Sequence, residues 1–151
     1  MIHDPTKCGG TAVASILVPH AWGPGFGVWT AARSPEPRVE PPASPAQGRG
    51  KALEEPIASW YERERGGCVA FGKPLVGPEP WMSGSPDRIV WPESDEDPRP
   101  TFGLEVKTAT SRQGWGPDGA DVTGLDAGSV IPPRYAVQVL WYLALSGFDC
   151  W

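Results

Sequence analysis

Three side chains near the middle of the chain have the types and the spacing of a divalent-cation site. Asp87 precedes a predicted hairpin, and Glu105 and Lys107 lie together in the second strand of that hairpin. Strand alternation puts Glu105 and Lys107 on one face, while Val106 points to the other. Two carboxylates and the Val106 carbonyl would supply the oxygen ligands that Mg²⁺ and Mn²⁺ prefer. Lys107 would orient a water molecule or stabilise negative charge on a phosphate.

The alternative is an ordinary surface hairpin in which the Glu105–Lys107 pair has no chemical role. Exposed ion pairs of this kind are common and contribute little to stability. A motif this short also matches many sequences by chance. The elements around the hairpin therefore decide between the two interpretations.

Two strands are predicted to carry these residues. Residues 88–91 and 102–106 are rich in β-branched and aromatic types, and a polar, proline-broken segment joins them. Residues 68–76 are predicted to form the strand that precedes the hairpin. In this arrangement Asp87 can fold over beside Glu105.

The N-terminal part is predicted to contain one short helix followed by irregular segments. Residues 8–18 show helical spacing of apolar residues, with Thr11 as the N-cap. The start of such a helix can receive a phosphate, although a packing helix is the simpler interpretation. Residues 19–29 are aromatic and glycine-rich, and we expect Trp22 and Trp29 in the core, with stacking on a base as the alternative. Residues 34–48 carry five prolines and are predicted to be a loop.

A second helix is predicted over residues 49–65. Its apolar residues lie at i, i+4, i+7 and i+8, which is the pattern of an amphipathic helix. Pro56 suits only the first turn of a helix, so the regular part is expected to begin near Glu55. The pair of glycines at 66–67 ends it.

The last predicted helix, residues 134–146, is largely apolar and stops at Gly147. Gln138 and Tyr142 are four residues apart, so their side chains share one face. Tyr135 can join that face. One interpretation is a core helix with a satisfied glutamine, and the other is a helix that turns Gln138 toward a site; the two are compatible.

Composition limits the class of protein. A chain of 151 residues is expected to form one domain, and 19 glycines and 19 prolines indicate long loops. The net charge of −5 argues against a generally basic nucleic-acid binder but not against a carboxylate metal site. Three scattered cysteines without a CxxC pair argue against zinc and favour free thiols in a reducing cytoplasm. No apolar run has the roughly 20 residues that a membrane span needs.

Taken in order along the chain, these motifs resemble the metal site of the PD-(D/E)XK nuclease superfamily, and the flanking residues resemble its YqaJ-type viral recombinase branch, which includes the lambda-exonuclease-like enzymes. The resemblance rests on Gly-x-x-x-Glu at residues 50–54, on Ser85-Pro86-Asp87, on Glu105-Val106-Lys107, and on Gln-x-x-x-Tyr at residues 138–142. It implies a restriction-endonuclease-like α/β fold, with a small mixed sheet flanked by helices, in a single nuclease domain over residues 1–151.

The resemblance also implies roles for individual residues. Glu54, with Glu55 as the alternative, would join the metal ligands. Lys107 would position or deprotonate water, and Gln138 would orient Lys107, the water or the DNA. The complete set comprises catalytic Asp87, Glu105, Lys107 and Gln138, metal ligands Glu54, Asp87, Glu105 and Val106, and substrate contacts Ser85, Thr11, Tyr142 and Arg112.

The activity that the resemblance implies is Mg²⁺-dependent hydrolysis of duplex DNA from its ends, with Mn²⁺ as a substitute, in phage-type recombination or repair. It further implies a bacterial or phage-infected host cytoplasm, a single-strand-annealing partner and a ring of three subunits. Two alternatives stay open, a catalytically inactive DNA-binding or assembly protein with the same fold and a structure-specific or nicking endonuclease. The chain stops soon after the last helix, where relatives usually continue, so we expect either a minimal version or a fragment truncated at its C-terminus.

Overall fold

The central strand of the fold is β4 (Arg88–Trp91), which lies between β1 (Cys68–Phe71) and β5 (Phe102–Leu104) in an antiparallel sheet. The computed structural model describes residues 7–19, 23–34, 42–92, 102–111, 115–116 and 131–148. Ile89 and Val90 are buried because β4 has a neighbour on each edge. The predicted hairpin is confirmed, with Arg88 paired to Leu104 and Val90 to Phe102. Its second strand is shorter than predicted, because β5 ends at Leu104 and not at residue 106.

The predicted strand over residues 68–76 is in fact two strands in two sheets. After β1, the chain turns and β2 (Leu75–Val76) pairs with β3 (Ser83–Gly84) in a separate two-stranded sheet. The break falls at Gly72, where a Cβ atom would lie 2.4 Å from the carbonyl oxygen of Pro86. Only glycine fits so close to the backbone that leads into β4.

The second helix, α3 (Pro45–Arg65), begins earlier than predicted. Ser44 and Gln47 form a capping box, and Pro45 occupies the first turn, where its missing N–H costs nothing. Residues 45–48 are therefore helical and do not belong to the predicted loop. Pro56 lies inside the helix, not in its first turn, on an exposed surface.

Two short helices form the N-terminal part. In α1 (Gly10–Leu17) the N-cap is Gly9, so the prediction of Thr11 as the cap is wrong. The second, α2 (Gly25–Arg33), includes the end of the aromatic, glycine-rich segment at residues 19–29, for which no helix was predicted. Trp29 of α2 is 54% exposed and stacks on Phe26, so it does not pack in the core.

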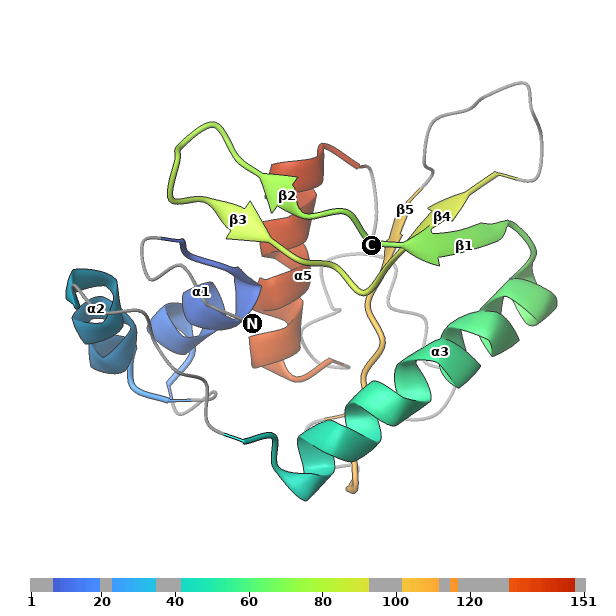
Figure 1. Ribbon diagram of the computed structural model, residues 1–151, viewed down its shortest axis with the longest axis horizontal. Coiled ribbons are helices and arrows are strands. Elements are labelled where there is room, and N and C mark those ends of the chain that lie inside the picture. Colours follow the sequence, from blue (N-terminus) through green and yellow to red (C-terminus); the bar gives the residue numbers. More distant parts are fainter. Residues whose placement is uncertain are drawn as a thin grey trace.

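The predicted C-terminal helix is confirmed as α5 (Pro133–Ser146), and Gly147 ends it in the left-handed conformation with φ 69°. Helix α5 packs against α1 and against the β2–β3 pair, whereas α3 contacts β1 on the other side (Figure 1). The protein is thus an α/β fold with small sheets between helices. None of the described helices is long and apolar enough to span a membrane.

Candidate active site

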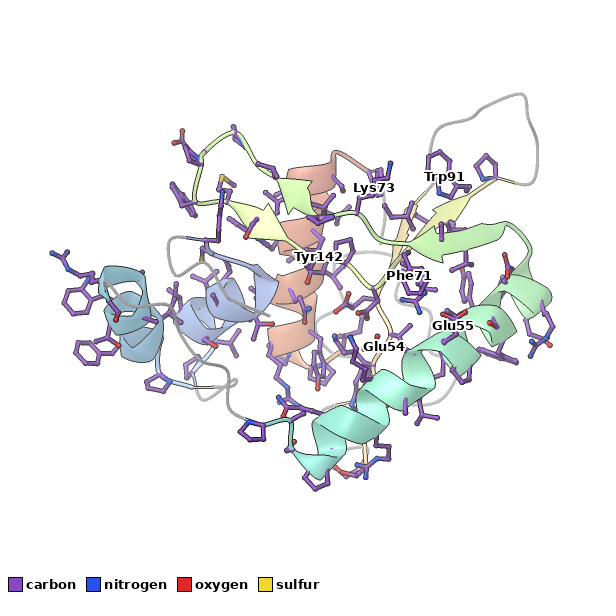
Figure 2. The ribbon with its side chains drawn as sticks, viewed as in Figure 1. Glu54, Glu55, Phe71, Lys73, Trp91 and Tyr142 are labelled. Carbon is purple, nitrogen blue, oxygen red and sulfur yellow. The ribbon has the colours of Figure 1, made fainter. Side chains whose placement is uncertain are left out.

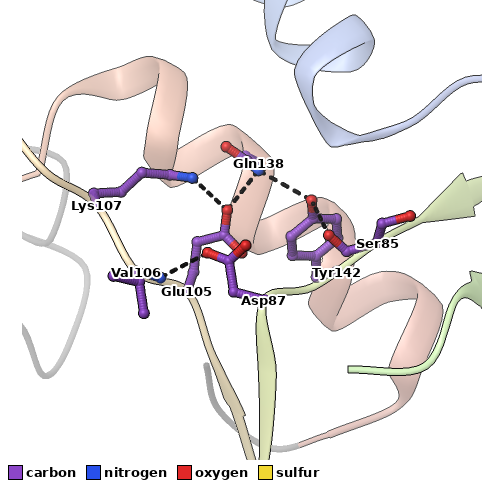
Figure 3. Close-up of polar contacts among 7 residues, drawn as sticks. All are labelled: Ser85, Asp87, Glu105, Val106, Lys107, Gln138 and Tyr142. Carbon is purple, nitrogen blue, oxygen red and sulfur yellow. Dashed lines mark hydrogen bonds and ion pairs between the residues drawn. The ribbon is translucent and has the colours of Figure 1, made fainter. Parts of the chain in front are cut away.

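The hairpin places the two central carboxylates at one end of the β4–β5 pair. Asp87 comes directly before β4 and Glu105 directly after β5, and the pairing of Arg88 with Leu104 makes them neighbours. The Val106 backbone N–H donates to Asp87 Oδ2 at 2.9 Å, which holds the Asp87 side chain over the end of β5. Figure 3 shows both carboxylates converging on this point.

Glu105 is the centre of the site. Its side chain is only 7% exposed. Lys107 Nζ forms an ion pair with Glu105 Oε1, and Gln138 Nε2 donates to the same oxygen at 2.7 Å (Figure 3). The other oxygen, Oε2, is buried and has no hydrogen-bond partner among the described residues. A buried carboxylate oxygen without a partner is costly, unless a ligand satisfies it.

Burial raises the pKa of Glu105 from 4.5 to about 6. The Lys107 ammonium opposes this rise in pKa, and the Asp87 carboxylate adds to it. The environment thus makes Glu105 take up a proton more readily than an ordinary glutamate. A positive charge bound at the site would oppose that uptake.

Helix α5 supplies the polar wall of the site. Gln138 and Tyr142 are buried on one face of the helix, as their spacing predicts. Gln138 Nε2 donates to Tyr142 Oη at 3.0 Å, and the Tyr142 hydroxyl donates to the Ser85 carbonyl at 3.3 Å. Burial, followed by the nearby Glu105 carboxylate, raises the pKa of Tyr142 to about 12, so this phenol stays protonated at neutral pH.

The first turn of α1 closes the site from the N-terminal side. A Cβ atom at Gly10 would lie 2.8 Å from Gln138 Cγ and 3.1 Å from Tyr142 Cε1. Glycine at this position therefore lets the helix approach Gln138. Thr11 and Ser85 both have exposed side chains near these contacts, and their contact with substrate stays a prediction. Arg112 lies outside the described residues.

Helix α3 turns one i, i+4 ridge, residues 50, 54, 58 and 62, toward the rest of the protein. At its start a Gly50 Cβ would lie 3.3 Å from Thr108 Oγ1, and at its end Glu62 Oε1 accepts from the Val69 N–H at 2.9 Å. Ala58 between them is 2% exposed. Glu54 belongs to this inner ridge and is half-buried.

Glu55 lies beside this ridge and has a different partner. Its Oε2 accepts from Arg88 Nη2 at 2.8 Å, and its side chain is 66% exposed. Figure 2 shows Glu54 and Glu55 leaving neighbouring positions of α3, with Glu55 directed toward Phe71. Glu54 thus lies on the inward side of α3 and Glu55 is paired with Arg88, while the part of either residue in metal binding stays a prediction.

Sequence reasoning missed Arg88, which the structure places next to the site. Its side chain is 6% exposed, and its guanidinium donates to the Asp87 carbonyl at 2.7 Å and lies 4.2 Å from the centre of the Phe71 ring. Together with the Glu55 ion pair, these contacts fix the backbone of Asp87 against α3. The only sequence signal was a charged residue in a strand that is otherwise apolar.

The donor set suits a hard divalent cation. Asp87 and Glu105 offer carboxylate oxygens, the Glu105 Oε2 atom has no other partner in the described part of the chain, and a Val106 carbonyl is adjacent. However, no group of three or more His, Cys, Asp or Glu side chains within the described ranges has the geometry to hold a metal ion. The structure therefore brings Asp87 and Glu105 together without gathering Glu54 into the same cluster.

The comparisons with known proteins identify the family and the fold. Residues 5–149 match the model of the YqaJ-like viral recombinase domain, so the chain belongs to that family. No curated protein gives a significant match.

Two solved structures are similar, the crystal structures of an alkaline exonuclease (LHK-Exo) from Laribacter hongkongensis and of LHK-Exo in complex with dAMP. Each is 20% identical in sequence to this chain, with TM-scores of 0.63 and 0.64, and each match covers 95% of this chain and 65% of the other. The predicted restriction-endonuclease-like α/β fold is thus confirmed. Its described strands pair antiparallel, whereas a mixed sheet was predicted. The chain spans about two thirds of the length of LHK-Exo.

Proposed function

We propose that this chain is a nuclease domain, extending over residues 1–151, that hydrolyses phosphodiester bonds from the ends of duplex DNA. One observation carries the proposal. The carboxylate of Glu105 is buried beside Asp87, is held on one oxygen by Lys107 and Gln138, and has no partner on the other oxygen within the described residues. Family membership and the likeness of the fold to an alkaline exonuclease support it.

The proposed cofactor is Mg²⁺, with Mn²⁺ as a substitute, held by Asp87, Glu105, the Val106 carbonyl and Glu54. When bound, it supplies charge neutralisation at the phosphate and lowers the pKa of a water molecule. The acidic donors and the partnerless Glu105 oxygen support this assignment.

The chain's own residues then perform the following work. As an ammonium, Lys107 orients the attacking water and faces the charge that develops on the phosphate. As a neutral amine it would instead take a proton from that water. Gln138 keeps the Glu105 carboxylate in one orientation, since its amide is itself fixed by Tyr142. This fixed geometry reduces the reorganisation that hydrolysis requires.

Contacts to the DNA backbone are proposed for four residues. The side chains of Thr11 and Ser85 are exposed, whereas Tyr142 is buried and accepts a hydrogen bond from Gln138. Arg112 is the fourth residue, because its positive charge would attract a backbone phosphate. The wider setting that we propose is phage-type recombination or repair in the cytoplasm of a bacterial host, with a single-strand-annealing protein as partner and a ring of three subunits as the assembly.

The experiment that tests the proposal follows Mg²⁺-dependent degradation of end-labelled linear duplex DNA. Lys107→Ala and Asp87→Asn should each abolish degradation, while Lys73→Ala, which removes an exposed lysine of the β1–β2 turn, should retain it. Closed circular DNA should be spared. Degradation of closed circles would indicate an endonuclease, and DNA binding by a folded protein without any degradation would indicate a DNA-binding or assembly role.

A further inference from the structure

A pocket of about 520 Å³ opens beside the Glu105–Lys107 pair, between α3, the end of β5 and the start of α5. Its size falls within the range of small-molecule sites. The described lining combines four aromatic side chains with the two charged residues of the candidate active site, namely Tyr61, Phe102, Trp115, Tyr135, Glu105 and Lys107.

The aromatic side chains form two pairs. Tyr61 of α3 meets Phe102 of β5 edge to face, with ring centroids 6.4 Å apart and planes at 78°. Trp115 stacks on Tyr135 of α5, with centroids 5.5 Å apart and planes at 29°. The pocket therefore has ring surfaces contributed by separate segments of the chain, an arrangement that suits a flat ligand.

The pocket is continuous with the candidate active site. Glu105 and Lys107 belong to its lining, and Lys107 Nζ lies 5.6 Å from the centre of the Tyr135 ring. The guanidinium of Arg134 lies 4.7 Å from the same ring centre. A planar ligand in the pocket would thus have its attached anionic group next to Lys107.

We propose that this pocket receives the base of a nucleotide that adjoins the scissile phosphate; the proposal rests on the function proposed above. A base is planar and largely apolar on its faces, and every base can stack on an aromatic ring, so the pocket would accept any sequence. A base at a duplex end must leave its partner to enter, and stacking in the pocket offsets the cost of unpairing. The base thereby aligns its own phosphate with Glu105 and Lys107.

The test compares linear duplexes that carry a tetrahydrofuran abasic residue, in turn, at each nucleotide flanking the first scissile bond. At one of these positions the wild-type kcat/KM should fall roughly 5- to 150-fold on loss of the base. In Trp115→Ala and Tyr61→Leu, the ratio of kcat/KM on the normal duplex to kcat/KM on the abasic duplex should shrink toward one. The matched control is Trp60→Ala, because Trp60 neighbours Tyr61 on α3 but is 54% exposed and outside the pocket lining, and it should keep the wild-type ratio.

An equal rate on normal and abasic ends in the wild type would overturn the proposal, as would an unchanged ratio in both pocket variants. Circular dichroism of each variant identifies one that fails to fold, and the other variant then decides. If the wild type degrades no DNA, the proposed function fails. A binding measurement then tests separately whether the pocket receives a base. In that case thymidine monophosphate should bind more tightly than deoxyribose 5-phosphate by calorimetry, and Trp115→Ala should remove the difference; equal affinities would refute the pocket.

Discussion

The buried carboxyl of Glu105 makes protein stability depend on pH in the direction opposite to that of an ordinary ion-paired glutamate. Its pKa rises from 4.5 to about 6 because burial outweighs the Lys107 ammonium. Between these two pH values the folded protein holds a proton that the unfolded chain has released. The corresponding stability is therefore fully present below about pH 4.5 and is lost as the pH rises through about 6.

The size of this effect follows from the shift in pKa. A rise of about 1.5 in pKa corresponds to about 2 kcal/mol at 1.36 kcal/mol per pH unit. Glu105→Gln has no proton to release. The free energy of unfolding of the wild type, measured by urea denaturation without added cation, should therefore decrease by about 2 kcal/mol relative to Glu105→Gln between about pH 4 and about pH 8.

Two further variants should move the midpoint of this dependence in opposite directions. Lys107→Met removes the ammonium that lowers the Glu105 pKa, so the midpoint should move to higher pH. Asp87→Asn removes a carboxylate that raises it, so the midpoint should move to lower pH. A pH-independent difference between the wild type and Glu105→Gln, or shifts of the same sign in these two variants, would refute the reasoning.

Three further predictions concern glycines and glutamates. Gly10→Ala should lower the free energy of unfolding in urea by about 1–3 kcal/mol, because its Cβ would lie 2.8 Å from Gln138 Cγ. Gly48→Ala in α3 should raise the free energy of unfolding by about 0.5–1 kcal/mol, because a Cβ there would have no atom within 4 Å. Equal effects of the two substitutions would contradict this account. Glu55→Gln should cost about 0.2–1 kcal/mol in the same assay, since it removes the charge of a carboxylate that is 66% exposed but keeps an acceptor for Arg88. Glu54→Gln should preserve stability but lose the rise in unfolding temperature that Mg²⁺ gives the wild type, and the reverse pattern would assign the metal role to Glu55.

The sequence predicted those parts of the site that depend on the spacing of residues within one hairpin or one helix. Alternation in the second strand placed Glu105 and Lys107 on one face, and the structure joins them in an ion pair, although both lie just beyond the end of β5. The four-residue spacing of Gln138 and Tyr142 put both on one face of α5, and both are buried there. The pattern also placed Asp87 near Glu105, since the strands pair as a hairpin. Metal binding and substrate contact by these residues stay predictions.

What the sequence did not predict depends on interactions that outweigh composition or span long distances. Prolines suggested a loop through residue 48, but the capping box of Ser44 and Gln47 starts α3 inside that segment. The β2–β3 pair is too short for a strand pattern to appear. The contact of Arg88 with Glu55 joins residues 33 positions apart, and nothing local marks either residue as the partner of the other.

The bond between Gln138 and Glu105 also has a consequence for the timing of assembly. These partners are 33 residues apart, and the N-terminal Lys7 meets Pro80 across 73 residues. Contacts of such high sequence separation form late, because a long loop must close before they contribute. On the ribosome both carboxylates are synthesised before α5, which completes their surroundings. The growing chain therefore carries the acidic pair without the amide that orients it, and the site matures only when α5 docks.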